Sequence, residues 1–560
     1  MAGKWLKLFP TATRNEVEFF LDGEDYYQSL IEAIDTAGEA GAQGYVYILG
    51  WMLDIRFPLV KGDSTQTLYN VLQRAAGKGA EIRILIWDNP LPEYAKLHAD
   101  AIPRLNKLPN TKAFLDPHTF FPQQSKHAIQ TLTPLIVLMI RLMQILEGTL
   151  RQSVITTSIL TALTSSHPTL ASGPLKLSAK LASERKALNS VLTSQTLGAH
   201  HEKVVVVKGK KGLIAYCGGI DINKNRVITE IGNRDFRFPS LHDTACRLAG
   251  PAAHDVLQKF KQRWRNHPEA GAFQLRGKDE TPPKEAAAPH PYVKVVGTYN
   301  RVDGGDPDRS LSEAYFKIID NARQFIYIED QYAVNVDVAQ ALNKKLKDPH
   351  FGGPLFIAIQ DSIATSDVFI PNRKRAEFLD AILNGVLADK VVVSMIDRTY
   401  YERDHYHPGM HAKTLIVDDE IAIIGSANVN RRSFTMDSET SAVVFNDLEE
   451  ARPADAFARK FRIATFYEFL RLKTMPKNKY ESISEYSKII RQGNPNLSIL
   501  IPYQPGPTDD MDVTICNAIA KTSPILAAVT AVNVHVLPLT CSQIQVAFGG
   551  LWDNLIDPKA

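Results

Sequence analysis

The strongest constraint on the fold is a local pattern that occurs twice in the chain. A histidine and a lysine two residues apart are followed by an apolar strand, a turn, a return strand and a pair of small residues. The two copies run through His201, Lys203 and Gly218-Gly219, and through His411, Lys413 and Gly425-Ser426. A single H-x-K triplet means little, but two copies in one context indicate a duplicated unit.

The segments upstream of the two copies also match each other. Residues 26–53 contain SLIEAIDTA, with apolar residues at helical spacing, and then the alternating strand YVYILGW. Residues 312–334 contain AYFKIIDNA and then FIYIEDQY. Helices that feed strands in this order predict an α/β fold. We expect two pseudo-twofold-related α/β/α sandwich halves with mixed sheets and one active site at their interface.

The domain boundaries follow from the linker-like sequence KDETPPKEAAAPHP at residues 278–291. We predict a first half at 1–277 with an insertion at about 97–199, a second half at 292–475, and a tail at 476–560 packed on the core. Leucines recur at helical spacing in the insertion, at 132–150 and 175–188. These amphipathic helices are expected to pack on the core or to lie on a membrane surface.

Composition narrows the class of protein. The 560 residues include 64 Lys+Arg and 61 Asp+Glu, and a net charge of +3 argues against a dedicated nucleic-acid binder. The four cysteines show no C-x-x-C spacing. No apolar run follows Lys4 and Lys7, so we expect synthesis in the cytoplasm without a signal peptide. The apolar runs at 132–146 and 525–539 are shorter than a membrane-spanning helix needs.

The residue types of the repeated pattern suit phosphate chemistry. In an extended strand, residues i and i+2 face the same side. The histidine and lysine of each copy therefore point toward the same place. The small residues let backbone approach a ligand, and the asparagines that follow can donate hydrogen bonds. Two such units could face each other across one site, where one histidine attacks phosphorus and the other protonates the leaving group.

These motifs resemble the phospholipase D superfamily, whose signature is H-x-K-x4-D followed by G-[GS]-x-x-N-like elements. The flanking segments ILGW, GGIDIN, LHDTACRLAGPAA, FKQRW, IYIEDQY and the terminal WDNLIDP also resemble phospholipase D proper. The resemblance implies a phosphodiester hydrolase that releases phosphatidic acid from glycerophospholipids at a membrane surface. It extends to bacterial type VI secretion lipase effectors. It therefore implies a toxin exported by a non-Sec route to the membrane of a target cell, with an immunity protein and a secretion spike protein as partners.

The resemblance also implies roles for individual residues. His201 is the expected nucleophile, which forms a phosphohistidine, and His411 is the expected general acid. The remaining site residues that it suggests are Lys203, Lys413, Asp418 and Glu439 as catalytic residues, and Asn223, Asn428, Asn430, Ser426 and Gly219 as substrate-binding residues. Glu439 matches the acid that orients a catalytic histidine. For its counterpart in the first half we choose Glu230 over Asp235.

One departure and several alternatives remain. Lys208 stands where the first motif should carry the aspartate that Asp418 supplies in the second. A nuclease, a phosphatidyltransferase of the same superfamily and a catalytically degenerate phospholipid-binding protein therefore stay open. We expect no cofactor and no metal, because His405 and His407 lie in a loop beside His411 without a set of converging ligands.

Overall fold

The computed structural model describes residues 3–89, 92–117, 198–227, 240–300, 306–360, 372–396, 409–447, 453–470, 482–494 and 497–503. The predicted helices at 132–150 and 175–188 and the apolar run at 525–539 lie outside these residues, as do His405 and His407. None of the described helices is long and apolar enough to cross a membrane.

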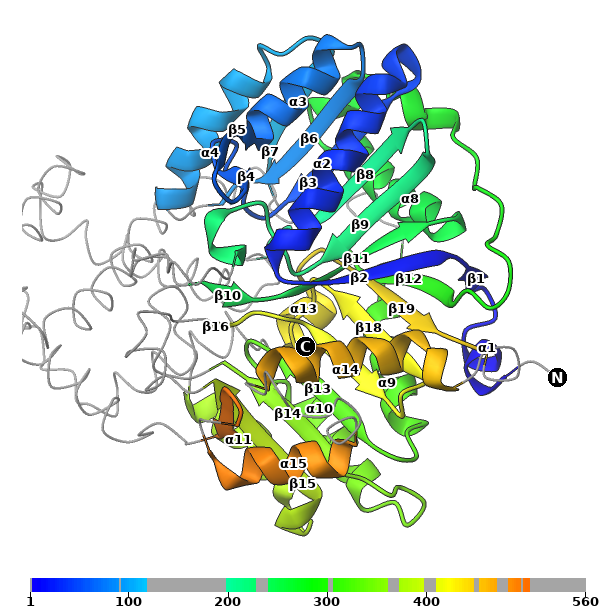
Figure 1. The fold of residues 1–560 in the computed structure, drawn as a ribbon, viewed down its shortest axis with the longest axis vertical. Coiled ribbons are helices and arrows are strands. Elements are labelled where there is room, and N and C mark those ends of the chain that lie inside the picture. The colour runs from blue at the N-terminus through cyan, green and yellow to red at the C-terminus, as the bar shows by residue number, and fades with distance from the viewer. Residues whose placement is uncertain are drawn as a thin grey trace, which may run out of the picture. The chain divides into compact units, whose positions relative to one another are not determined.

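The first half is built on a mixed sheet of seven strands (Figure 1). Only the neighbours β3–β6 and β6–β7 are parallel, and the other pairs are antiparallel. The strand order is β2 (Glu16–Leu21), β11 (Thr244–Ala249), β9 (Gly212–Gly218), β8 (Val204–Gly209), β3 (Tyr45–Gly50), β6 (Glu81–Trp87) and β7 (Thr111–Asp116).

The second half contains a sheet of nine strands that repeats this order. Here β13–β14 and β14–β15 are the parallel neighbours. The order is β1 (Thr13–Arg14), β12 (Tyr292–Thr298), β19 (Glu439–Phe445), β18 (Ile421–Gly425), β17 (Thr414–Val417), β13 (Ile326–Asp330), β14 (Leu355–Ile359), β15 (Val391–Ile396) and β20 (Leu500–Pro502). Seven consecutive strands of this sheet, from β12 to β15 in spatial order, match the seven strands of the first sheet one for one. The predicted duplicated α/β fold is therefore confirmed.

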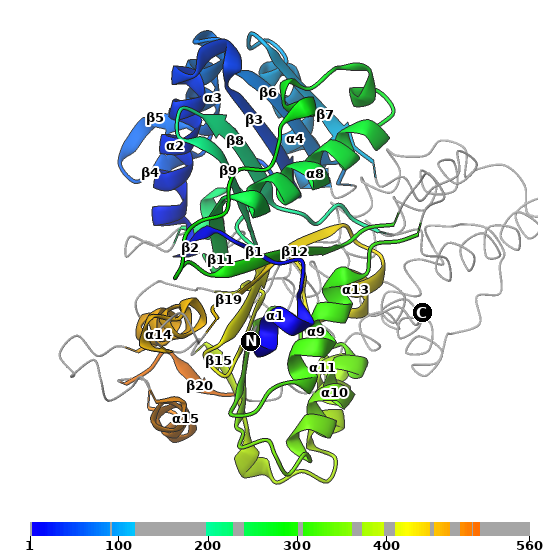
Figure 2. The same cartoon turned by 90° about the vertical axis from the view of Figure 1, so that its right-hand side faces the viewer.

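Helices cover both faces of each sheet. Strand alternation explains this, because Val46 and Ile48 of β3 pack with α2, α3 and α4, while Tyr47 packs with α8. In the second half α9, α10 and α11 lie on one face and α14 and α15 on the other (Figure 2). The helices are α1 (Lys4–Leu8), α2 (Gly23–Glu39), α3 (Leu68–Gly77), α4 (Pro92–Leu105), α8 (Pro251–Asn266), α9 (Ser310–Asp320), α10 (Val336–Leu346), α11 (Asn372–Leu383), α13 (Arg431–Thr435), α14 (Phe457–Phe469) and α15 (Ile483–Gln492).

Two boundaries differ from the sequence prediction. Helix α4 and strand β7 belong to the first half, because β7 extends the parallel β3–β6 pair, so the insertion starts after Asp116 rather than near residue 97. Strand β1 pairs with β12, which places the N-terminal residues on the second sheet. Within the predicted tail, β20 pairs with β15. Of the predicted linker at 278–291, residues 278 and 279 end a 3-10 helix, and residues 280–291 contain no helix or strand.

Candidate active site

The two H-x-K segments lie directly before equivalent strands. His201 and Lys203 precede β8, and His411 and Lys413 precede β17. All four side chains are largely withdrawn from solvent. Strands β8 and β17 are central and apolar. They therefore fix the H-x-K residues that precede them at one end of each sheet.

Each histidine segment docks against the other half. The His201 amide donates to the Ser438 carbonyl at 3.0 Å, and the His411 amide donates to the His242 carbonyl at 2.8 Å. A parallel bridge joins His200 to Ser438, and a short parallel pair joins β10 (Leu241–His242) to β16 (Gly409–Met410). The residue that follows Ser438 or His242 is an acid, so this docking brings each histidine to a carboxylate.

The carboxylates orient both imidazole rings. Nδ1 of His201 lies 3.0 and 3.2 Å from the carboxylate oxygens of Glu439. Nδ1 of His411 lies 2.7 Å from Oδ2 of Asp243. Each carboxylate accepts a hydrogen bond from Nδ1–H, which leaves Nε2 of each ring as the nitrogen for chemistry. Both acids are almost completely buried.

Burial sets the charge states of these groups. It lowers the pKa of His201, and the Lys203 and Lys413 charges lower that pKa further. Burial raises the pKa of Glu439 to about 7, although Lys203 and the Ser426 hydroxyl oppose the shift. Burial raises the pKa of Asp243 as well, against the Arg226 charge. Burial and the Arg226 charge lower the pKa of His411 too, so both histidines are neutral in the empty site. For His201 this is the form that a nucleophile needs.

The lysines supply positive charge beside the rings. Lys203 Nζ donates to the His201 carbonyl at 2.8 Å, and Lys413 Nζ donates to the His411 carbonyl. Burial lowers the pKa of both ammonium groups, to about 7 for Lys413, while nearby carboxylates including Asp243 partly offset the shift. An anionic phosphodiester that pairs with both ammonium groups would offset the cost of burying their charges.

Arg226 is a site residue that the sequence did not reveal. Its NH2 lies 3.3 Å from Nε2 of His411, and its Nε lies 3.0 Å from the Asp243 carboxylate. It belongs to a short 3-10 helix after the first glycine pair, residues Lys224–Arg226. The equivalent position in the second half is Ser433, so comparison of the two copies could not identify it.

Gly219 and Ser426, two predicted substrate-binding residues, lie against the two acids. A Cβ on Gly219 would lie 2.0 Å from Oδ1 of Asp243, so glycine is needed to admit that carboxylate. The Ser426 hydroxyl, at the equivalent position, donates to Oε2 of Glu439. The small-residue pair therefore shapes the pockets of the two acids, and substrate binding by Gly219 and Ser426 stays a prediction.

The three predicted asparagines divide into two kinds. Asn223 and Asn430 are helix caps, because their side-chain oxygens accept from the amides of Asn225 and Ser433. The Asn428 side-chain oxygen is buried and has no hydrogen-bond partner among the described residues. Substrate contact stays a prediction for all three, because a phosphodiester would accept from their side-chain nitrogens rather than from these oxygens.

Asp418 lies away from the catalytic residues. It follows the far end of β17, and its carboxylate accepts from the backbone amides of Arg323, Gln324 and Phe325 at 2.8, 2.7 and 3.0 Å. It is a fold-supporting residue, so its assignment as catalytic is corrected. Lys208 lies at the corresponding end of β8 and forms an ion pair with Glu280 at 2.6 Å. The departure at Lys208 therefore does not touch the active site.

Glu230 and Asp235, our candidates for the acid of the first half, lie outside the described residues. The contact predicted for them is made by Asp243. The signal was present in the sequence, because LHDTAC contains Asp243 in a segment that resembles phospholipase D. The pairing could not be inferred, because it crosses from one half to the other.

An aromatic wall borders His201. Trp51 lies edge-on to the His201 ring, with centroids 6.3 Å apart, and contacts Trp87 and Tyr94. Lys203 Nζ lies 5.6 Å from the Trp51 ring centroid. The Trp51 ring therefore lies beside both the nucleophile and the ammonium group of Lys203, where a cation–π contact favours the charged lysine.

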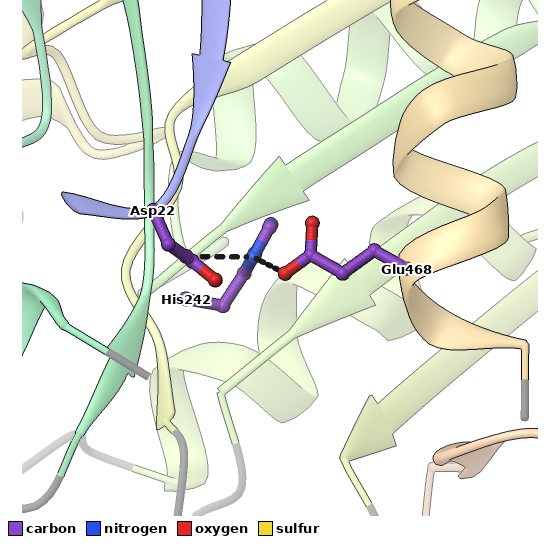
Figure 3. Close-up of side chains that lie close together, drawn as sticks. All are labelled: Asp22, His242 and Glu468. Carbon is purple, nitrogen blue, oxygen red and sulfur yellow. Dashed lines mark hydrogen bonds and ion pairs between the residues drawn. The ribbon is translucent and has the colours of Figure 1, made fainter. Parts of the chain in front are cut away.

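A second group of titratable side chains lies behind Asp243. His242 Nδ1 is 3.2 Å from Asp22 and 3.0 Å from Glu468 (Figure 3). Their ligand-type atoms lie within 4.8 Å of one another, so these three residues could hold a divalent cation. A proton also satisfies them: burial alone would lower the pKa of His242, but Glu468 and Asp22 raise it. Asp22 accepts from the Asp243 amide at 2.8 Å, which ties this group to the active site.

Comparisons with known proteins agree with this geometry. Residues 315–462 match the family model described as cardiolipin synthase, PLD-like domain. Phospholipase D alpha 1 of Ricinus communis is 24% identical over 401 residues, which cover 50% of each chain. These matches support the predicted relationship to the phospholipase D superfamily.

The chain is also similar to a cardiolipin synthase of Staphylococcus aureus, 27% identical over 263 residues and 46% of each chain. The chain thus spans about half the length of the curated relatives that it matches. A solved phosphatidylserine synthase of Haemophilus influenzae aligns at a TM-score of 0.47 and 12% identity, over 78% of this chain and 84% of that one.

Proposed function

We propose that the chain is a phospholipase D that hydrolyses the head-group phosphodiester of glycerophospholipids to phosphatidic acid. The observation that carries the proposal is the pair of histidines, each oriented through Nδ1 by a buried carboxylate of the other half. Two oriented rings with adjacent ammonium groups provide a nucleophile, an acid and charge stabilisation for phosphoryl transfer.

The reaction would proceed in two displacements. Nε2 of His201 attacks phosphorus, the bond to the head-group oxygen breaks, and His411 gives its Nε2 proton to that oxygen. Water then attacks the phosphohistidine while His411 takes a proton from it, the phosphorus–nitrogen bond breaks, and phosphatidic acid leaves. Glu439 stabilises the positive charge on His201, and Lys203 and Lys413 bind the non-bridging oxygens.

Head-group release tests this proposal. We expect purified protein to release choline or ethanolamine from phosphatidylcholine or phosphatidylethanolamine vesicles and to leave phosphatidic acid. His201→Ala and His411→Ala should abolish release, whereas the exposed His350→Ala should not change it. Full activity in either catalytic variant would overturn the mechanism.

Phosphatidyl transfer is the second candidate, and the cardiolipin synthase match favours it. The same phosphohistidine would be attacked by an alcohol instead of water. Adding glycerol or a primary alcohol to the vesicles distinguishes the two: a transferase yields mainly the phosphatidyl alcohol, and a hydrolase yields mainly phosphatidic acid. A nuclease would instead degrade plasmid DNA and leave lipid intact.

We further propose that the enzyme acts as an antibacterial effector on a target-cell membrane, with an immunity protein in the producing cell. Support comes from the sequence resemblance to type VI secretion lipase effectors. Expression targeted to the periplasm of a susceptible bacterium should arrest growth and deplete phospholipid, and His201→Ala should remove the toxicity. Equal growth with either protein would contradict the proposal.

A further inference from the structure

Arg226 contacts the nitrogen of His411 that the proposed reaction uses. The distance from NH2 to Nε2 is 3.3 Å. A guanidinium group only donates hydrogen bonds and keeps its charge at all ordinary pH values. The contact therefore requires that Nε2 of His411 carry no proton, which agrees with the direction in which burial and the Arg226 charge shift the His411 pKa.

The rest of the guanidinium group is anchored. Nε lies 3.0 Å from Oδ2 of Asp243, and NH1 donates to Oδ1 of Asn225 at 2.7 Å. NH2 is 3.5 Å from Oδ2 of Asp221, a longer distance than the other two. The side chain is buried, so the group stays in the site while NH2 retains some freedom to change partner.

This arrangement breaks the symmetry of the two halves. Arg226 lies eight residues after Gly218, and Ser433 lies eight residues after Gly425 (226 − 218 = 433 − 425). Around Glu439 the corresponding groups are neutral, because the Ser426 hydroxyl donates to the carboxylate. Beside Asp243, by contrast, lies the guanidinium cation of Arg226, which forms an ion pair with the carboxylate. Of the two equivalent histidines, His411 is thus the one whose Nε2 faces a fixed positive charge.

A general acid must begin the reaction with a proton on Nε2, which the Arg226 contact excludes. We propose that Arg226 is a substrate-binding residue that keeps His411 unprotonated until a phosphodiester enters. A non-bridging phosphate oxygen then accepts the hydrogen bond of the Arg226 NH2 group in place of His411, and Nε2 of His411 accepts a proton from solvent. The inference rests on the proposed phosphodiester chemistry, and it makes protonation of the acid dependent on substrate.

Arg226→Gln tests the phosphate contact. Losing one charge-assisted hydrogen bond should raise KM for a short-chain phosphatidylcholine about tenfold. Arg226→Lys, which keeps the charge, should recover part of that loss. Arg431→Gln is the matched control, because Arg431 occupies the second copy of the motif and pairs with Asp337 at an exposed position. Unchanged KM in Arg226→Gln would contradict the proposal.

The protonation step is followed by nitrogen NMR of labelled histidine, with tungstate as a phosphate mimic. In the wild type, tungstate should convert Nε2 of His411 from the unprotonated to the protonated form at neutral pH. In Arg226→Gln, His411 should titrate at higher pH without tungstate.

If tungstate binds and Nε2 stays unprotonated, or if Arg226→Gln lowers only kcat, Arg226 merely anchors Asp243. The wild-type titration needs no variant that could fail to fold. It is also independent of lipid turnover, so failure of the proposed function would be seen separately in the vesicle assay.

Discussion

Glu439 belongs to the second half of the molecule, yet its carboxylate lies 3.0 Å from Nδ1 of His201 in the first half. The reverse pairing joins His411 to Asp243 at 2.7 Å. Among the described residues, each histidine is oriented by an acid of the other half, so the observed site is complete only when both halves are assembled.

Glu439→Gln should reduce kcat at least a hundredfold. The amide cannot stabilise an imidazolium and can favour the wrong tautomer, the effect known from catalytic triads. The measurement is head-group release under saturating lipid, with Glu313→Gln on the exposed face of α9 as control. Activity within threefold of wild type would show that the carboxylate has no catalytic function.

Asp243→Asn should cause a loss of similar size, whereas Glu230→Gln should retain most activity. The reason is that Asp243 holds Nδ1 of His411, the position for which the sequence suggested Glu230. Both variants are compared in the same assay after their thermal stability is checked. The opposite ranking would restore Glu230 as the acid of the first half.

The activity should fall on the acidic side of neutrality. Glu439 has a pKa of about 7 because it is buried, so it becomes protonated below that pH and no longer stabilises positive charge on His201. We expect kcat/KM to fall about tenfold per pH unit below 7. This acidic fall in kcat/KM should be missing from the pH profile of the residual activity of Glu439→Gln. If it persists there, the fall belongs to another titrating group.

The same shift acts on stability with the opposite sign. A buried carboxyl whose pKa is raised from 4.5 to about 7 favours the folded state below the lower value, and this contribution is lost as the pH rises to 7. The folded protein is therefore less stable at pH 7 and above, where Glu439 is ionised, than it would be with an unshifted carboxyl.

Asp418→Ala should destabilise the fold and leave the chemistry intact. Three backbone amides would lose their acceptor in a buried turn, at a cost of about 2–4 kcal/mol in the free energy of unfolding. Urea titration measures this loss, and Asp320→Ala on an exposed position is the control. A large fall in kcat at low temperature, with stability unchanged, would return Asp418 to the active site.

Lys208→Asp should not increase activity, although it restores the motif aspartate. Lys208 is partly exposed and pairs with Glu280, so its replacement removes a screened ion pair worth about 1 kcal/mol or less. We expect kcat to stay within twofold of wild type and the melting temperature to fall slightly. A large gain in kcat would show that Lys208 impairs catalysis.

Local patterns were sufficient to predict the strands and the H-x-K residues, because alternation and repetition are visible along the chain. Strands β3, β8, β13 and β17 lie where the sequence placed them. Contacts between the halves were not predictable, since the β10–β16 pairing and the approach of Asp243 to His411 depend on how the two sheets dock. Arg226 was missed for a similar reason, because its counterpart in the repeat is a serine.

Trapping of the intermediate tests the central claim most directly. Rapid acid-free quenching of the protein with a short-chain phosphatidylcholine, followed by peptide mass spectrometry, should locate a phosphatidyl group on His201. His201→Ala should show no adduct, and His411→Ala should accumulate it if the first step still occurs. An adduct on His411, or rapid lipid turnover with no adduct on either histidine, would contradict the account.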